Sequence, residues 1–164
     1  MERKLVHKIM INLKNLLTKP LQLIPKWTII AIVILALIGF GDATYITVKH
    51  FQGIIPPCSI EGCEVVLTSS YSEILGIPVS LFGMAFYFAI LLSLFIYFDS
   101  KKEIFIKIPI VISAVGFVGS LYFISIMAFV LKAFCQYCAV SAFSSISIFI
   151  ISLFILYKNY AKSE

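Results

Sequence analysis

The sequence has little charge, and this alone excludes a water-soluble protein. Only 13% of its 164 residues are Asp, Glu, Lys or Arg, whereas 61% are hydrophobic and the mean hydropathy is +1.05. Soluble domains carry about 25% charged and about 45–50% apolar residues. We therefore expect the chain to lie in a lipid bilayer.

The chain also lacks the length for a separate soluble domain and the hairpin repeats of a membrane barrel. A helix needs roughly 20 apolar residues to cross a hydrocarbon core of about 30 Å, and four such runs are present, at 27–48, 79–98, 104–131 and 134–157. No small-residue cleavage site follows the first run, so it is interpreted as a retained anchor and not as a secretory signal. The sequence predicts an all-α, integral membrane four-helix bundle, with an exofacial loop and a short helical segment, over 69–75, between its first two helices.

One four-helix domain, residues 27–157, is expected between a basic amphipathic segment, 1–26, and a tail, 158–164. Apolar side chains recur at helical spacing in the first segment, with lysines between them. Two interpretations remain open: an interfacial helix on the inner leaflet, or a basic tail that acts only as a topology signal.

The net charge of +5 does not point to nucleic acid, because the basic residues lie beside the hydrophobic runs. Eleven of them fall on one side of the predicted membrane: Arg3, Lys4, Lys8, Lys14, Lys19, Lys26, Lys101, Lys102, Lys107, Lys158 and Lys162. Only Lys49 and Lys132 fall on the other side. The positive-inside rule predicts a multi-pass plasma-membrane protein with both termini in the cytoplasm and all four cysteines facing outward.

The four cysteines form two pairs. Cys58 and Cys63 lie in the long first outer loop, where Pro56, Pro57 and Gly62 indicate turns. Cys135 and Cys138 form a CxxC motif at the start of the fourth run, where spacing of three places both sulfurs on one helix face. Because a helix N-terminus favours thiolate, we expect lowered pKa values and reactive sulfur in this second pair.

Several noncatalytic interpretations are compatible with the same residues. Oxidising compartments make static disulfides common, so the pairs could brace a membrane scaffold. All four thiolates, or three of them with His50, have the composition of a structural zinc site, although two pairs on separate loops at an oxidising face argue against a metal. A cysteine-lined metal transporter is the remaining noncatalytic alternative.

The order of the motifs resembles the vitamin K epoxide reductase family in its short prokaryotic form. The resemblance rests on the loop cysteine pair, on Val66-Leu67-Thr68-Ser69-Ser70, on Gly76-Ile77-Pro78-Val79-Ser80-Leu81-Phe82-Gly83 before and within the second run, and on the CxxC. It implies a membrane thiol oxidoreductase that oxidises a thioredoxin-fold protein outside the cell. The electrons would pass to a menaquinone- or ubiquinone-type acceptor, in support of disulfide bond formation. Since the chain stops at Glu164, that partner is expected to act in trans.

The family also assigns roles to individual residues. Cys58 matches the cysteine that exchanges with the partner, Cys63 the one that relays to Cys135, and Cys138 the one that faces the quinone. Ser69 matches a serine or threonine near the quinone, although it could instead cap the helical segment at 69–75. The aromatic side chains expected round the quinone ring are Phe82, Phe86, Tyr87 and Phe143.

Two positions depart from the vertebrate enzyme. Val79 stands where that enzyme has an asparagine, and Ala142 where it has a tyrosine, so the resemblance favours quinone reduction over epoxide reduction. A DsbB-type oxidase, which also has four helices and four cysteines, places its CxxC in the first outer loop, whereas here the motif starts the fourth helix.

The sequence does not assign a definite function to two ionisable residues near the outer face, Asp42 and His50. Asp42 lies in the outer third of the first run, where a carboxylate could relay protons, pair with Lys49 or Lys132, or simply be hydrated. His50 is interpreted as an isolated interfacial histidine.

Overall fold

A computed structural model of the chain describes residues 24–58, 62–102 and 104–161. Nearly all of the basic segment expected at 1–26, and the end of the tail, lie outside these ranges. Helices make up 80% of the described residues, so the all-α prediction is confirmed.

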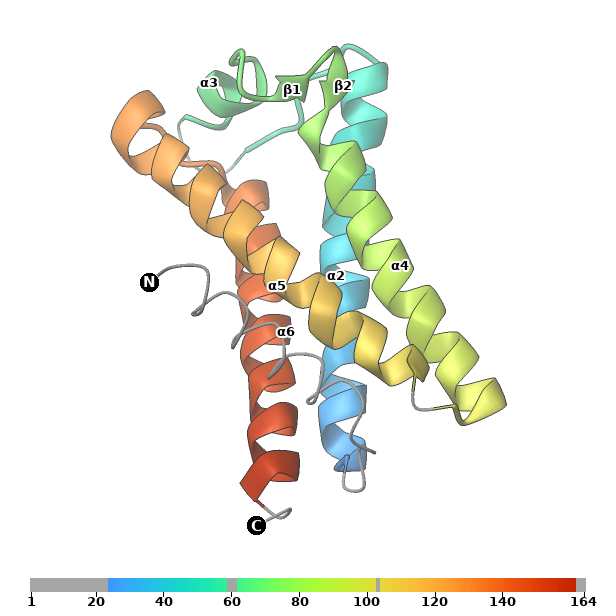
Figure 1. The fold of residues 1–164 in the computed structure, drawn as a ribbon. Coiled ribbons are helices and arrows are strands. Elements are labelled where there is room, and N and C mark those ends of the chain that lie inside the picture. The colour runs from blue at the N-terminus through green and yellow to red at the C-terminus, as the bar shows by residue number, and fades with distance from the viewer. Residues whose placement is uncertain (1–23, 59–61, 103, 162–164) are drawn as a thin grey trace.

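Four long helices form the bundle, in the places that the apolar runs predicted (Figure 1). They are α2 (Lys26–Phe51), α4 (Val79–Ser100), α5 (Ile104–Ser125) and α6 (Gln136–Ala161), and α5 continues as a π-helix, η1 (Ile126–Leu131). Each is long and apolar enough to cross a membrane. Because lipid offers backbone groups no hydrogen-bond partners, such runs satisfy their own by forming helices.

Proline and left-handed residues set several of the helix ends. Pro25 and Pro78 precede the first turns of α2 and α4 with φ near −60°, where the missing N–H costs nothing. Lys101 ends α4 and Lys132 ends η1, both with positive φ. These reversals make the connections on either side of α5 short, so that α5 packs against both α4 and α6.

The core of the bundle lies toward the end where α2 starts and α6 finishes. Ile32, Ile90, Leu94, Ile148 and Ile155 are all at most 1% exposed there. Helix α2 packs on α4 and α6, and α5 packs on the same two helices. Toward the opposite end α4 and α5 diverge (Figure 1). We call this opposite end, where α2 and η1 finish and α4 and α6 begin, the cysteine end.

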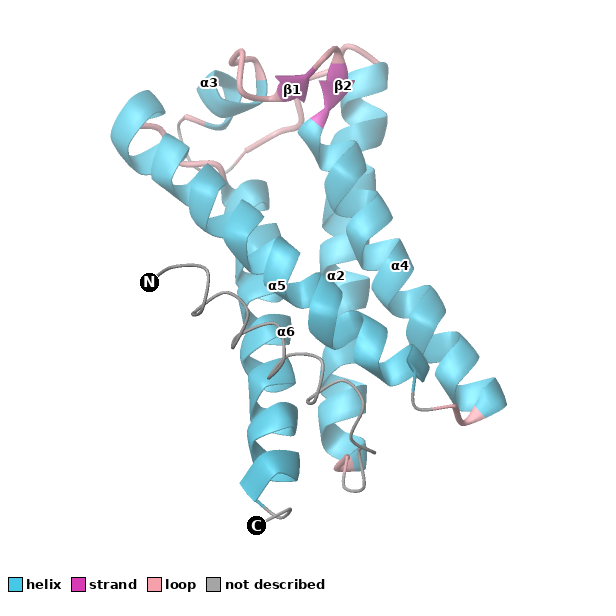
Figure 2. Ribbon diagram, viewed as in Figure 1, coloured by secondary structure: helices cyan, strands magenta, loops and turns pink. Residues whose placement is uncertain are grey.

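A small cap covers the cysteine end (Figure 2). It contains a short helix, α3 (Cys63–Leu67), and a two-stranded antiparallel hairpin of β1 (Glu73–Ile74) and β2 (Ile77–Pro78). The predicted short helical segment exists, but its expected position at 69–75 is wrong. Leu75 and Gly76 both have positive φ and form the two-residue turn of the hairpin, which a helix there would not allow.

Candidate functional site

The loop pair of cysteines is joined by a disulfide between Cys58 and Cys63, whose Cα atoms lie 6.2 Å apart. Cys63 begins α3 and is 1% exposed, whereas Cys58 is half-buried. The side chain of Cys63 is therefore buried, whereas that of Cys58 is partly accessible from outside the bundle. This asymmetry suits an exchange in which Cys58 meets another protein and Cys63 stays inside.

The second pair, Cys135 and Cys138, is reduced, and its two residues lie on either side of the first residue of α6. Cys135 directly precedes the helix and is fully buried, and Cys138, in the first turn, is half-buried. The backbone N–H of Cys138 donates to Sγ of Cys135 over 3.5 Å. The CxxC motif thus lies at a helix N-terminus, as the sequence predicted.

The two thiols of this pair are not equivalent. A hydrogen bond from the Cys138 thiol, aided by backbone N–H groups, lowers the pKa of Cys135 from 9.0 to about 7, although burial acts in the opposite direction. When the pair ionises, Cys135 therefore carries the negative charge, and the Cys138 thiol donates a hydrogen bond to it. The sequence predicted a lowered pKa for both thiols of the pair, whereas in the structure the lowered pKa belongs to Cys135.

The two pairs meet in one buried cluster. Cys63 and Cys135 pack with Val66 and Met127, and both Cys58 and Cys138 contact this group. Two elements far apart in sequence, the cap and the start of α6, are thereby held together at the sulfurs. The relay that the resemblance implied requires this proximity.

Two further contacts press the cysteine loop onto the start of α6. Gly62 has a φ of 108°, and a Cβ there would lie 3.2 Å from the backbone nitrogen of Phe134. The Tyr137 hydroxyl donates to the carbonyl of Pro57 over 2.7 Å. A glycine at 62 is needed both for its backbone conformation and for the close approach.

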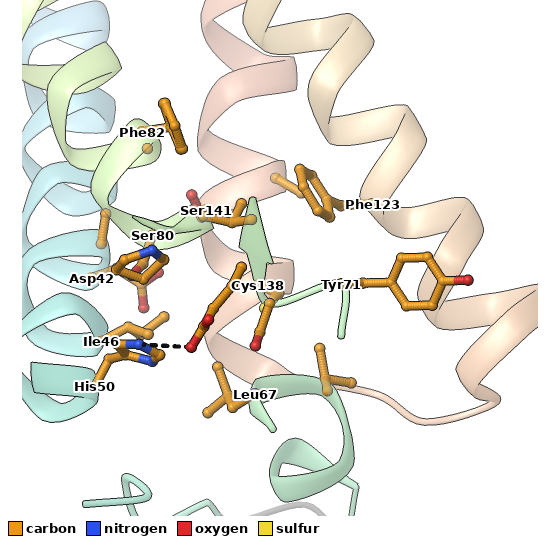
Figure 3. Close-up of a pocket in the computed structure, with 18 of the residues that line it drawn as sticks. Asp42, Ile46, His50, Leu67, Tyr71, Ser80, Phe82, Phe123, Cys138 and Ser141 are labelled. Atoms are coloured by element: carbon orange, nitrogen blue, oxygen red, sulfur yellow. Dashed lines mark ion pairs between the residues drawn. The ribbon is translucent and has the colours of Figure 1, made fainter. Parts of the chain in front are cut away.

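A cavity of about 570 Å³ lies inside the cysteine end. Its wall is mostly apolar and comes from all four long helices and the cap. Of the four cysteines, all within the described ranges, only Cys138 lines it (Figure 3). The cavity therefore reaches one sulfur of the reduced pair, while Cys135 stays behind it against the disulfide.

Four of the five residues predicted to surround a quinone line this cavity: Ser69, Phe82, Phe86 and Tyr87. The fifth, Phe143, is 69% exposed on the outside of α6, away from the described cavity lining. It follows Ala142, which does line the cavity, and adjacent residues of a helix face different directions. Ser69 does not cap a helix at 69–75; its hydroxyl donates to the carbonyl of Val66, over 2.8 Å, near the end of α3.

The cavity also contains polar residues that sequence reasoning missed. Ser141 and Ser145 follow Cys138 at spacings of three and seven, on the same face of α6, and both line the cavity. The Tyr87 hydroxyl donates to the Ser141 carbonyl over 2.6 Å. This serine spacing from Cys138 was the signal available in the sequence.

The ionisable residues near the cavity differ in their pairing. His50 is not isolated: its Nε2 lies 3.2 Å from Oε1 of Glu73, and both residues line the cavity. Of the alternatives left open for Asp42, an ion pair with Lys49 or Lys132 does not form among the described residues, and its Oδ2 is buried without a hydrogen-bond partner. No three described His, Cys, Asp or Glu side chains gather as metal ligands.

The cavity has the chemistry of a site for a flat, lipid-soluble ring. Its volume lies within the range of about 300–1,000 Å³ usual for small-molecule sites, and Phe82, Phe86 and Tyr87 offer aromatic surface. Buried oxygens of Asp42 and Ser145 lack protein partners among the described residues, and both residues belong to the lining. An apolar ring that carries oxygens at its edge, such as a quinone, matches this combination.

The comparison with known families agrees with this geometry. The model of the Vitamin K epoxide reductase family matches residues 30–153, which is most of the chain. The matched range includes both cysteine pairs and the helix segments that line the cavity. No curated protein matches the chain.

Proposed function

The chain belongs to the vitamin K epoxide reductase family, and on that premise we propose that it oxidises a thioredoxin-fold protein in trans and reduces a membrane quinone. The coarser activity follows from membership itself: the family is one of oxidoreductases, and this is a multi-pass membrane member. The observation that carries the proposal is the division of the reduced pair. Cys138 faces the cavity, while Cys135 packs with Cys63.

The proposed orientation has both termini in the cytoplasm and the cysteine end outside. Eleven Lys and Arg residues flank one side of the spans, and only Lys49 and Lys132 flank the other. A membrane-impermeant thiol reagent added to intact cells after mild reduction should label Cys58. Labelling only after the cells are opened would contradict the orientation.

The relay begins at the loop disulfide. A thiolate of the partner attacks Sγ of Cys58, and Cys63 leaves as a thiolate that attacks Cys135 in a Cys135–Cys138 disulfide. The partner's second thiol then releases Cys58, and Cys58 re-forms its bond with Cys63. Two electrons now reside on Cys135 and Cys138. The structure, with a loop disulfide and a reduced CxxC pair, has the bonding of this stage.

The second half of the relay takes place at the cavity. A bound quinone accepts two electrons and two protons. Phe82, Phe86 and Tyr87 would hold its ring beside Cys138, and the cap would exclude water. When Cys135 and Cys138 close their disulfide, the S–H bond of Cys138 breaks, one S–S bond forms, and the pair gives up two electrons and one proton. The second proton of the quinol comes from water.

A single-turnover experiment tests quinone reduction. The purified protein is reduced, freed of dithiol, and mixed without oxygen with a short-chain quinone whose absorbance reports its reduction. We expect up to two equivalents of quinol from the wild type, one for each reduced cysteine pair, and a first-turnover rate at least about a thousandfold lower for Cys138→Ala. Cys58→Ala is the matched control and should keep the wild-type rate, because it lies before this step. Equal rates for all three proteins would contradict the proposal.

The partner can be sought separately. Cys63→Ala leaves the thiol of Cys58 without its resolving sulfur, so a mixed disulfide with the partner should accumulate. We expect extracytoplasmic thioredoxin-fold proteins in the trapped adduct, and the adduct should vanish when Cys58 is also replaced. Exclusively cytoplasmic proteins would contradict the proposed direction and orientation.

A further inference from the structure

Two buried polar atoms stand out in the described part of the chain because they have no hydrogen-bond partner. They are Oδ2 of Asp42 and Oγ of Ser145, and both residues line the cavity beside Cys138. Buried polar groups are nearly always paired in native proteins, so orphaned atoms that gather at one cavity indicate a ligand or water between them. The carboxyl group is the one that can carry a proton.

The depth of Asp42 follows from the packing of α2 on α6. The Tyr45 and Tyr137 rings lie 5.6 Å apart, so these residues mark one level of the two antiparallel helices. Asp42 precedes Tyr45 by three residues and Cys138 follows Tyr137 by one, so Asp42 lies about 3 Å, roughly half a turn, deeper than Cys138. The carboxyl and the thiol thus line the same cavity at similar depths, Asp42 from α2 and Cys138 from α6 (Figure 3).

The charge of Asp42 acts on the cysteine pair. The hydrogen bond from Cys138 is the main influence that lowers the pKa of Cys135, and the negative charge of Asp42 acts against it. A carboxylate that opposes a second negative charge nearby also attracts the proton that thiolate formation releases. Asp42 is therefore electrostatically linked to the thiols without being hydrogen-bonded to them.

The other ionisable groups that line the cavity are either exposed, as Tyr71 is at 44%, or paired. The Tyr87 hydroxyl, from α4, donates to the Ser141 carbonyl. His50 and Glu73 form a pair with each other, with side chains 30% and 46% exposed. Among the described lining residues, this leaves Asp42 as the acid–base group with a buried atom that has no hydrogen-bond partner.

We propose that Asp42 is the proton carrier of the cavity: its Oδ2 takes the thiol proton of Cys138 and passes it to an oxygen of the quinone. This inference rests on the proposed function. Per turnover the Cys138 thiol and the Cys135 thiolate lose one proton and two electrons and form one S–S bond; the quinone gains these two electrons, the Cys138 proton through Asp42 and a second proton from water. Asp42 gains and loses one proton, so it returns to its starting state.

The test uses the full-length protein in the same single-turnover reaction. Asp42→Asn keeps the size of the side chain but cannot carry a proton, and its rate should fall at least about a hundredfold. Asp42→Glu should recover part of the rate. Asp42→Ala should regain activity in proportion to added formate, a response that a merely structural role would not produce. Asp99→Asn, at an exposed aspartate of α4 outside the described lining, is the matched control and should behave as wild type.

A second measurement needs neither quinone nor turnover. Loss of the opposing negative charge should lower the pKa of Cys135 further in Asp42→Asn, so its alkylation should reach half its maximal rate at a lower pH than in the wild type. Asp99→Asn should leave this midpoint unchanged. Quinone affinity, measured by equilibrium binding, should change less than the rate in Asp42→Asn.

The outcomes separate this inference from the function on which it rests. A wild-type protein that reduces no quinone would overturn the proposed function itself. A wild type that reduces quinone, with Asp42→Asn equally fast, would overturn only the role of Asp42. Loss of quinone affinity that accounts for the whole rate loss, without formate rescue, would make Asp42 a binding residue and would likewise overturn proton transfer.

Discussion

The two ends of the bundle are built from similar apolar helices, yet they differ in what they enclose. Toward the end where α2 starts, which we call the core end, Ile32, Ile90, Leu94 and Ile148 fill the interior with at most 1% exposure. The cysteine end instead encloses a cavity, a disulfide, a reduced thiol pair and two unpaired buried oxygens.

The comparison teaches that one end is arranged for stability and the other for chemistry. Dense packing of branched side chains gains dispersion energy even in lipid, where the hydrophobic effect between helices is absent. A cavity forfeits those contacts, and orphaned polar atoms cost further free energy. Substitutions that change packing are therefore expected to destabilise the protein less at the cysteine end than at the core end. At the cysteine end they are expected to reduce the reactivity of the thiols instead.

The largest expected effect in the comparison is at the core end. Leu94→Ala removes a side chain that is 1% exposed and should cost about 2–5 kcal/mol of unfolding free energy, because a buried void remains. Reversible unfolding in mixed detergent micelles measures it. Leu92→Ala, on the same helix but 46% exposed, is the matched control and should cost much less. Equal costs at both positions would show that the core end is not tightly packed.

The next effect is expected where the two ends meet. Gly39 packs on the ring of Tyr87, and a Cβ at position 39 would overlap that ring. Gly39→Ala should therefore cost about 1–3 kcal/mol by overpacking and should displace the floor of the cavity. Gly41→Ala, where a Cβ would meet no described atom within 4 Å, should be near neutral in the same unfolding assay. An equally neutral Gly39→Ala would contradict the close contact of α2 with α4.

A smaller effect is expected in the reactivity of the cysteine end. Since the pKa of Cys135 is lowered to about 7, its alkylation should rise with increasing pH and reach half its maximal rate near pH 7. Cys138→Ala removes the largest cause of that shift, so the midpoint should move upward and the rate at pH 7 should fall at least about tenfold. Mass spectrometry of the peptide that contains Cys135 measures the rate. An unchanged midpoint would assign the shift to the helix terminus instead.

The smallest effect is expected at the rim of the cavity. The ion pair of His50 and Glu73 is partly exposed, and such pairs contribute about 0–1 kcal/mol. Glu73→Gln should therefore change unfolding free energy by less than about 1 kcal/mol, and high salt should reduce the difference further. A larger loss would mean that the hairpin holds the cysteine end together more firmly than its short strands indicate.

Part of the site was predictable because it depends on local spacing. Both cysteine pairs, the CxxC at a helix start and the aromatic residues Phe82, Phe86 and Tyr87 were identified before any tertiary contact was known. Spacing from Cys138 would also have indicated Ser141 and Ser145. Phe143 lies outside the described cavity lining. Aromatic character does not predict which side of α6 faces the cavity, because that side is set by the neighbours of the helix.

The cap was the least predictable region. Its short helix occurs at Cys63–Leu67 and not at 69–75, because Leu75 and Gly76 adopt the positive φ of a hairpin turn. Local preference favoured a helix from Ser69 onward, whereas the observed turn allows β2 to pair with β1 and leads the chain into α4. The sequence also did not predict that Cys135 and Cys138 differ in thiol pKa. This difference depends on burial and on which thiol donates the hydrogen bond.

The sequence by itself determined the four spans, because backbone groups in lipid have to satisfy one another within a helix whatever surrounds them. It also identified the four cysteines as the candidates for redox chemistry, since thiols are the redox-active side chains available. Only the tertiary structure decided that Cys138 and not Cys135 reaches the cavity, and that Asp42 lies beside it unpaired. The physical reason is that burial and charge are properties of neighbours brought together from different helices, and residue order along the chain does not specify them.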